Sequence, residues 1–265
     1  MGYKTKIDWC DTSWNPVTGC RHGCKYCYAR GIANRFGGYS LGAHATQANY
    51  VFNDGNYELD EYLLKLGCMD KLRSAPYPFK FEPTFHRYRL DQPKKWTEPR
   101  TIFVCSMADL FGEWVPDEWI REVIAACKAA PQHRYLFLTK NPGRYRELFV
   151  KEILPTEDNF WYGSTTDTPE TEFFWSGFVK TFVSIEPILK PFTDLVDEGC
   201  FPVSKTNWII VGAETGNRKD KIIPEKSWIS ELEEFATATN TPIFMKESLR
   251  NLMGDDFKQQ FPWEV

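Results

Sequence analysis

Three cysteines lie within eight residues of one another near the amino terminus. They are Cys20, Cys24 and Cys27, in the stretch TGCRHGCKYCYAR over residues 18–30. Three thiolates on one tight loop can hold three irons of a [4Fe–4S] cube, which leaves the fourth iron free to bind another molecule. With 8 Cys in 265 residues, this spacing arises by chance in about one such chain in a hundred. Gly19 and Gly23 let the backbone fold closely around such a cluster.

Two other kinds of metal site fit the same cysteines. Zinc held by three Cys and His22 is the first, and it would organise a nucleic-acid-binding domain. A cluster used only for electron transfer is the second, although such a cluster normally has four thiolates. The other five cysteines are scattered along the chain, and we expect them to be small buried hydrophobic residues.

The elements that must position the cysteine loop follow a regular rhythm. Short apolar runs of β character alternate with segments of helical spacing. The predicted strands are 13–17, 84–90, 101–105, 135–138, 160–163, 181–185, 208–211 and 242–245, and the predicted helices after residue 100 are 116–127, 142–154, 169–177 and 228–236. This alternation predicts a parallel sheet covered on both faces. Eight units in this length fit a (β/α)8-like barrel of about 250 residues, full or partial, and an open doubly wound sheet is the alternative.

Residues 38–80 interrupt this rhythm. They are rich in Gly, Asn, Tyr and Lys, and a helix is expected at Glu58–Leu72. We expect residues 1–265 to form one barrel domain, with 38–80 as an inserted segment or lid over the barrel mouth. A structureless loop is the alternative. The tail 251–265 is expected to pack through Phe261 and Trp263.

Charged or hydroxylated residues stand where each predicted strand of this rhythm ends. They are Ser106, Asp109, Thr139, Lys140, Ser164, Glu186, Glu214, Lys246 and Glu247. Because the carboxyl ends of parallel strands meet at one mouth of a barrel, we expect these side chains to surround the cysteine loop, which follows the first strand. Ion pairs between Lys140 and Glu186 and between Lys246 and Glu214 are expected there.

With Tyr26 before the last cysteine, the loop reads C-x3-C-x-aromatic-C and resembles the signature of the radical S-adenosylmethionine (radical SAM) superfamily. The resemblance implies that Cys20, Cys24 and Cys27 bind a [4Fe–4S] cluster whose open iron chelates S-adenosylmethionine, with Tyr26 near the adenine. A reductant protein would supply one electron, and cleavage would give methionine and a 5′-deoxyadenosyl radical that abstracts hydrogen from a substrate. By position in such a barrel, Ser106, Lys140, Ser164 and Glu186 would contact S-adenosylmethionine. Asp109, Glu214 and Lys246 would face the substrate.

Several further strings resemble a phage-associated family of unknown function with a three-cysteine motif. They are WNPVTGC at 14–20, CYA at 27–29, SMADLF at 106–111, LTK at 138–140, SIEP at 184–187 and VGAETG at 211–216. This resemblance covers nearly the whole chain except 38–80 and does not name a substrate. The Gly-Gly-Glu that commonly follows the second strand of radical SAM proteins is absent, since residues 91–93 are Asp-Gln-Pro.

Composition restricts the partners. The formal net charge is −4, so any binding to nucleic acid must come from a local patch rather than from overall charge. The run His86, Arg87 and Arg89, with Tyr77 and Tyr88 nearby, is a candidate for such a patch, and a nucleic-acid base is the first candidate substrate.

No apolar window approaches the roughly 18 residues of a membrane span, and the polar start predicts no signal peptide. We therefore expect a cytoplasmic protein without membrane partners.

Overall fold

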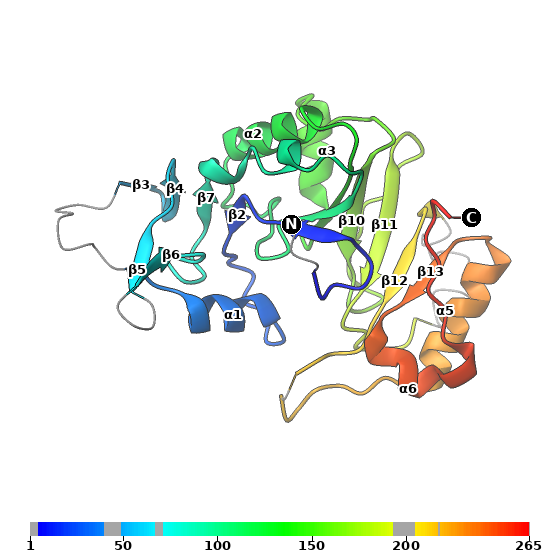
Figure 1. Ribbon diagram of the computed structural model, residues 1–265. Helices are drawn as coiled ribbons and strands as arrows, with labels where there is room; N and C mark the ends of the chain where they lie inside the picture. The colour runs from blue at the N-terminus through cyan, green and yellow to red at the C-terminus, as the bar shows by residue number, and fades with distance from the viewer. Residues whose placement is uncertain (1–4, 40–48, 67–70, 193–204, 217, 265) are drawn as a thin grey trace.

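The computed structural model describes residues 5–39, 49–66, 71–192, 205–216 and 218–264. Within them, seven parallel strands form a curled sheet that makes a partial barrel (Figure 1). The spatial order of the strands is their order along the chain: β1 (Thr12–Trp14), β8 (Thr101–Val104), β9 (Arg134–Thr139), β10 (Phe160–Thr165), β11 (Lys180–Ile185), β12 (Ile209–Val211) and β13 (Ile243–Met245). The predicted α/β class and parallel sheet are confirmed, and the strand order rules out the doubly wound alternative, in which that order reverses.

The two faces of this sheet carry different cores. Side chains alternate along each strand, so in β10 Phe160 and Tyr162 pack under the helices, whereas Trp161 points to the concave side. The outer face is covered by α2 (Asp117–Lys128), α3 (Gly143–Val150) and α5 (Lys226–Ala238). The concave side is filled by a separate, mostly aromatic cluster, which we call the inner core: Trp9, Phe103, Leu136, Trp161, Phe182, Trp208, Ile210 and Phe244. Phe261 and Trp263 pack against it, as expected for the tail.

A second, smaller sheet lies beside the half-barrel (Figure 1). Its order is β2 (Val17–Thr18), β7 (Thr84–His86), β4 (Asn56–Leu59) and β3 (Val51–Asn53). The prediction of a barrel strand at 84–90 was therefore wrong. Because β1 pairs directly with β8, with Thr12 opposite Ile102, no place is left for a strand between them.

Two predicted helices are also absent. The described residues of 58–72 contain the end of β4, β5 (Leu64–Leu66) and the start of β6 (Leu72–Ser74), and β5 and β6 pair antiparallel. Residues 169–177 form turns and extended chain. There, Thr171 Oγ1 donates to Asp167 Oδ1 at 3.1 Å and Thr166 Oγ1 donates to the Thr168 carbonyl at 3.0 Å. Such local hydrogen bonds from side chains compete with helix formation.

The other helices of the described residues are α1 (Tyr28–Phe36), α6 (Arg250–Met253) and the 3-10 turns η2 (Arg87–Arg89), η3 (Pro93–Lys95), η5 (Glu247–Leu249) and η6 (Gly254–Asp256). In the described part of the chain, none of the helices is long and apolar enough to cross a membrane.

Candidate functional site

A cavity of about 750 Å³ opens above the inner core, at the carboxyl ends of the strands. Its walls come from the cysteine loop, from α1 and from the residues that follow the strands of the half-barrel. Cys20, Cys24 and Cys27 all line it. The cavity therefore joins the one chemically distinctive loop of the sequence to the polar ends of the sheet, as predicted for a parallel barrel.

The cysteine loop connects β2 to α1 and is tied to the body of the protein at its start. Gly19 N donates to the Met107 carbonyl at 2.9 Å, and Cys20 N donates to the Phe81 carbonyl at 3.2 Å. Gly19 has φ +91°, and an added Cβ would lie 2.7 Å from Pro83 N and closer still to the carbonyl of Glu82. Only glycine fits such a backbone and such a close approach, so the loop's path past the strand ends depends on this residue.

The three cysteines are free thiols. Burial raises the pKa of Cys20 to about 12, and burial also raises the pKa of Cys24. Cys27 caps α1, because its Sγ accepts a hydrogen bond from Arg30 N at 3.4 Å. Of the other cysteines, Cys105 and Cys127 are buried, as predicted, Cys10 is partly buried, and Cys68 and Cys200 lie outside the described residues.

Within the described ranges, no three His, Cys, Asp or Glu side chains lie close enough together to hold a single metal ion. A zinc ion needs its ligand atoms about 2–2.3 Å from one point. A cube of four irons makes a different demand, because each thiolate binds its own iron. Three separate thiols facing one cavity have the chemistry and the number of donors that such a cube requires.

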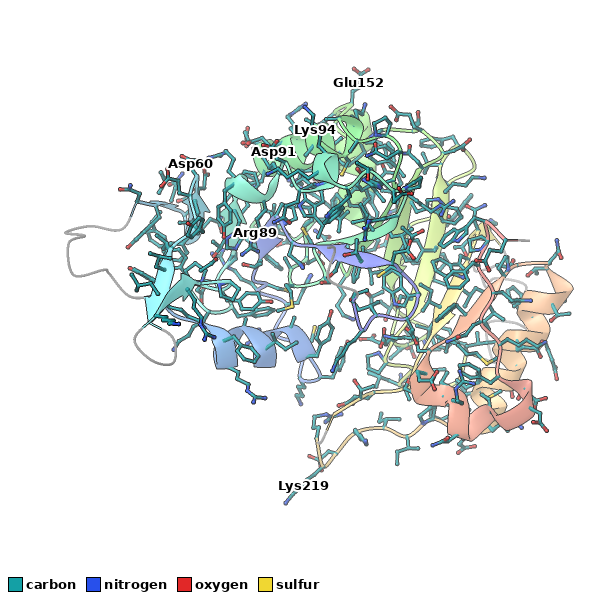
Figure 2. The ribbon with its side chains drawn as sticks, viewed as in Figure 1. Asp60, Arg89, Asp91, Lys94, Glu152 and Lys219 are labelled. Atoms are coloured by element: carbon teal, nitrogen blue, oxygen red, sulfur yellow. The ribbon has the colours of Figure 1, made fainter. Side chains whose placement is uncertain are left out.

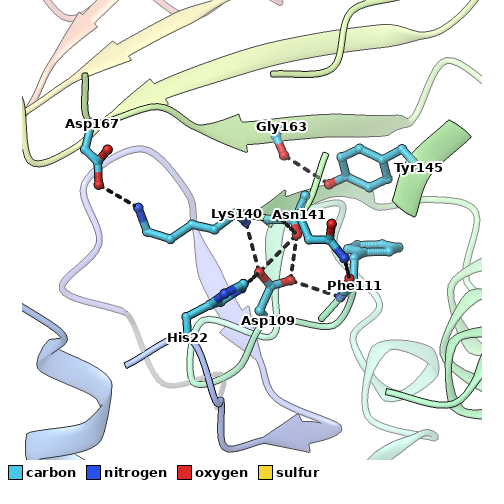
Figure 3. Close-up of polar contacts among 9 residues, drawn as sticks. His22, Asp109, Phe111, Lys140, Asn141, Tyr145, Gly163 and Asp167 are labelled. Atoms are coloured by element: carbon cyan, nitrogen blue, oxygen red, sulfur yellow. Dashed lines mark hydrogen bonds and ion pairs between the residues drawn. The ribbon is translucent and has the colours of Figure 1, made fainter. Parts of the chain in front are cut away.

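Asp109 is the most heavily hydrogen-bonded group of the site (Figure 3). Its Oδ1 accepts from Phe111 N at 3.0 Å, and both of its oxygens accept from Thr139 Oγ1, at 2.8 and 3.0 Å. Its Oδ2 also accepts from Lys140 N at 2.9 Å and lies 2.7 Å from His22 Nε2. Asp109 is only 5% exposed. The carboxylate therefore joins the cysteine loop to the ends of β8 and β9, and its lone pairs are committed to the protein.

A second polar group joins the loop to the end of β10. Lys140 Nζ donates to Asp167 Oδ2 at 3.1 Å and lies 5.3 Å from the centre of the Tyr26 ring, and the Tyr26 hydroxyl donates to the same carboxylate oxygen. Burial acts to raise the pKa of Asp167, but the hydrogen bonds from Tyr26 and Lys140 outweigh it, so the pKa is lowered. The carboxylate therefore stays ionised and holds the ammonium group beside the tyrosine.

The ion pairs of the rim differ from the predicted ones. Lys140 pairs with Asp167 rather than with Glu186, and Lys246 pairs with Glu186, with Nζ 2.5 Å from Oε1, rather than with Glu214. Glu214 instead accepts two hydrogen bonds from Arg218, each of 2.7 Å. Strand order explains the first pair, since Lys140 and Asp167 follow the neighbouring strands β9 and β10. Lys246 instead reaches past β12, where Gly212 leaves room for its side chain.

Most of the predicted site residues line the cavity. They are Cys20, Cys24, Cys27, Tyr26, Ser106, Asp109, Lys140, Glu186, Glu214 and Lys246. Ser164 does not, and this prediction was wrong. Ser164 is fully buried on the helix-covered face, where its Oγ accepts from Phe174 N at 2.9 Å, while the next residue, Thr165, lines the cavity. Because side chains alternate along a strand, a shift of one residue exchanges the two faces.

Sequence reasoning missed Asp167 as a partner of the site. Its only signal was its place two residues after the end of β10. Tyr77 and Phe81 also line the cavity; Phe81 was not predicted to do so, whereas Tyr77 belongs to the segment expected to cover the mouth. Tyr77 is the one described residue of 38–80 that lines it, so a lid formed by that segment stays a prediction.

The basic run at 86–89 serves the fold. Arg87 is held by three carboxylates, those of Glu58, Asp60 and Glu122, at 2.8 to 2.9 Å. Arg89 donates to the backbone carbonyls of Asn15 and Pro76, each at 2.9 Å; it and Asp60 are labelled beside the second sheet in Figure 2. His86 is completely buried and lies 2.8 Å from Thr18 Oγ1. The run is therefore not a free basic patch, because Arg87 is ion-paired, Arg89 is bonded to backbone carbonyls and His86 is buried; binding of nucleic acid there stays a prediction.

Comparison with known proteins gives a family without an assigned activity. Neither the curated proteins nor the solved structures contain a match to this chain. One family model, described as "Protein of unknown function (DUF5131)", matches residues 4–252. The match includes the cysteine loop and every strand of the half-barrel. The chain therefore belongs to this family of proteins of unknown function.

Proposed function

We propose that this protein is a radical SAM enzyme in which Cys20, Cys24 and Cys27 bind a [4Fe–4S] cluster. The observation that carries the proposal is the convergence of three free thiols on one cavity at the carboxyl ends of a parallel half-barrel. Enzymes built on parallel barrels have their active sites at this end. A loop with three thiolates and no fourth also suits a cluster that must keep one iron open.

When bound, a [4Fe–4S] cluster would supply one electron for the reductive cleavage of S-adenosylmethionine. The chain's own residues bind and orient that molecule. Lys140, held by Asp167 beside Tyr26, provides a cation for the carboxylate of the methionine part. Ser106 and Glu186, which line the same cavity, provide a hydroxyl and a carboxylate for the ribose hydroxyls. Thr165 takes the place that we first gave to Ser164.

The floor of the cavity suits a reactive intermediate. The inner core beneath it consists mostly of aromatic rings, and Trp9 and Phe103 of that core also line the cavity. An apolar floor excludes water and so limits side reactions of a reactive intermediate. Glu214 and Lys246 lie on the rim with paired charges and are proposed to face the substrate. The electron comes from a reductant protein in the cytoplasm, where thiols stay reduced.

The test is formation of 5′-deoxyadenosine by anaerobically reconstituted protein with dithionite and S-adenosylmethionine. The wild type is expected to form it, and Cys24→Ala is expected to form none. Cys10→Ala is the matched control, because Cys10 is a free, partly buried thiol that does not line this cavity. Equal activity of the wild type and Cys24→Ala would refute the proposal. Stoichiometric zinc without labile sulfide would favour a zinc-organised protein instead.

A further inference from the structure

We propose that His22 and Asp109 form a positioning pair that holds the cysteine loop in the conformation that binds the cluster. This inference rests on the proposed function and assigns a role that the sequence did not suggest. Asp109 was expected to face a substrate. Its hydrogen bonds with Phe111, Thr139, Lys140 and His22 leave no lone pair for one, so it acts through the residues that it holds.

The cysteine loop needs anchors between its ends. Residues 19–27 contain no helix or strand of their own. Side chains between the cysteines make the connections: Arg21 donates to the Gly55 carbonyl at 2.7 Å, His22 reaches Asp109, and Tyr26 donates to Asp167. The partner of Arg21 is a turn of the second sheet. Only the other two anchors therefore connect the loop to the sheet that carries the rest of the site.

The His22 anchor is the more rigid of these two. Asp109 is buried and fixed from two strand ends, by Phe111 N after β8 and by Thr139 and Lys140 at the end of β9 (Figure 3). The His22 ring also packs edge-on against Trp114, with centroids 5.0 Å apart. A carboxylate that cannot move, bonded to the middle of the segment between Cys20 and Cys24, restricts where those two thiols can lie. Outer hydrogen bonds of this kind typically change metal affinity by about 10–100-fold when they are removed.

The test compares four variants with the wild type after anaerobic reconstitution. His22→Ala removes the bond, and His22→Gln keeps a donor near the position of Nε2. Asp109→Asn replaces one accepting oxygen by a donor. Asp117→Asn is the control, because this carboxylate also holds two side chains, those of Arg144 and Lys151, but supports α2 and not the loop. Each variant is measured for iron per chain, for the chelator concentration that removes half of the iron, and for the electron paramagnetic resonance spectrum of the reduced cluster.

We expect His22→Ala and Asp109→Asn to lower the half-removal concentration by at least about 10-fold and to alter the spectrum. His22→Gln is expected to restore most of the chelator resistance and of the wild-type spectrum, and Asp117→Asn is expected to match the wild type. His22 has a side chain that is 23% exposed, so its variants are expected to fold even where Asp109→Asn does not.

Two results would overturn the inference while leaving the proposed function standing. In the first, His22→Ala behaves as the wild type in both chelator resistance and spectrum. In the second, His22→Gln fails to restore binding while a folded Asp109→Asn binds normally, which would show that His22 does not act through Asp109. Absence of iron and sulfide from the wild type would instead refute the proposed function, and the inference with it.

Discussion

Replacing Gly163 by alanine tests whether the concave side of the half-barrel is the packed floor of the site. Gly163 lies in β10, and its partner in the register of the neighbouring strand β11 is Phe182. An added Cβ would lie 2.6 Å from Cε1 of Phe182 and closer still to two other ring atoms. Carbon atoms in contact are about 3.5–4.0 Å apart, so the ring must move by about 1 Å or more.

The neighbours of Phe182 restrict that movement. Its ring is fully buried and lies 6.2 Å from Trp9 and 5.9 Å from Trp208, measured between ring centres. Overpacking of a close-packed interior costs about 1–3 kcal/mol, and with three overlapping atoms we expect a value near the upper limit. For a urea m-value of about 3 kcal/mol per molar, this lowers the unfolding midpoint by about 1 M.

The assay is urea unfolding of Gly163→Ala, Phe182→Leu and the double variant. Removing the ring costs stability by itself, but it also makes room for the new methyl group. We therefore expect the double variant to be more stable than the sum of the two single effects by at least about 1 kcal/mol. A cost below about 0.5 kcal/mol for Gly163→Ala, or simple additivity, would show that the two side chains do not meet on the concave side.

Three further predictions concern groups outside the cysteine loop. Burial, and then Arg89, lowers the pKa of His86 well below its usual 6.5; the unfolded chain therefore binds a proton that the folded protein does not. The free energy of unfolding that this difference provides above pH 6.5 is lost as pH falls, by about 1.4 kcal/mol at pH 5.5. If the urea midpoint of His86→Gln depends on pH as steeply as that of the wild type, this prediction is contradicted. Arg87→Met is expected to lower the free energy of unfolding by only about 1 kcal/mol, because the ion pairs of Arg87 are partly exposed and screened. It is also expected to leave any binding of single-stranded DNA unchanged. If the salt dependence of DNA binding instead falls by about one unit of slope, Arg87 contacts a phosphate and the nucleic-acid patch is restored. Ser164→Ala is expected to cost about 1 kcal/mol of stability without changing the affinity for S-adenosylmethionine. Thr165→Val is expected to weaken that affinity without a similar loss of stability. If equilibrium dialysis shows weaker binding for Ser164→Ala and unchanged binding for Thr165→Val, our assignment of the two faces is contradicted.

The parts of the fold that were predictable have strong local signals. The six strands after residue 100 are continuous apolar runs, because both faces of a parallel sheet are buried. The cysteine loop was predictable as a site because its spacing is improbable and its residue types are chemically specific. The positive φ of Gly19 and Gly23 agrees with the tight backbone expected there.

The parts that failed depend on contacts between distant segments. Arg87 and Arg89 read as an exposed basic run, because nothing local shows that Glu58, Asp60 and Glu122 come together around Arg87. The partner of Lys140 was misassigned for the same reason, since Asp167 follows a different strand. Ser164 failed because the last residues of a strand give no local sign of which face they occupy, and an error of one position exchanges the faces.

The most direct test of the proposed function is the iron and acid-labile sulfide content of anaerobically reconstituted protein. We predict about four irons and four sulfides per chain for the wild type and for Cys10→Ala, because three thiolates at this spacing hold a cube. Cys24→Ala should retain little of either while keeping the far-ultraviolet circular dichroism of the wild type. Equal iron and sulfide in Cys24→Ala and the wild type, or one zinc per chain with no sulfide, would contradict the account.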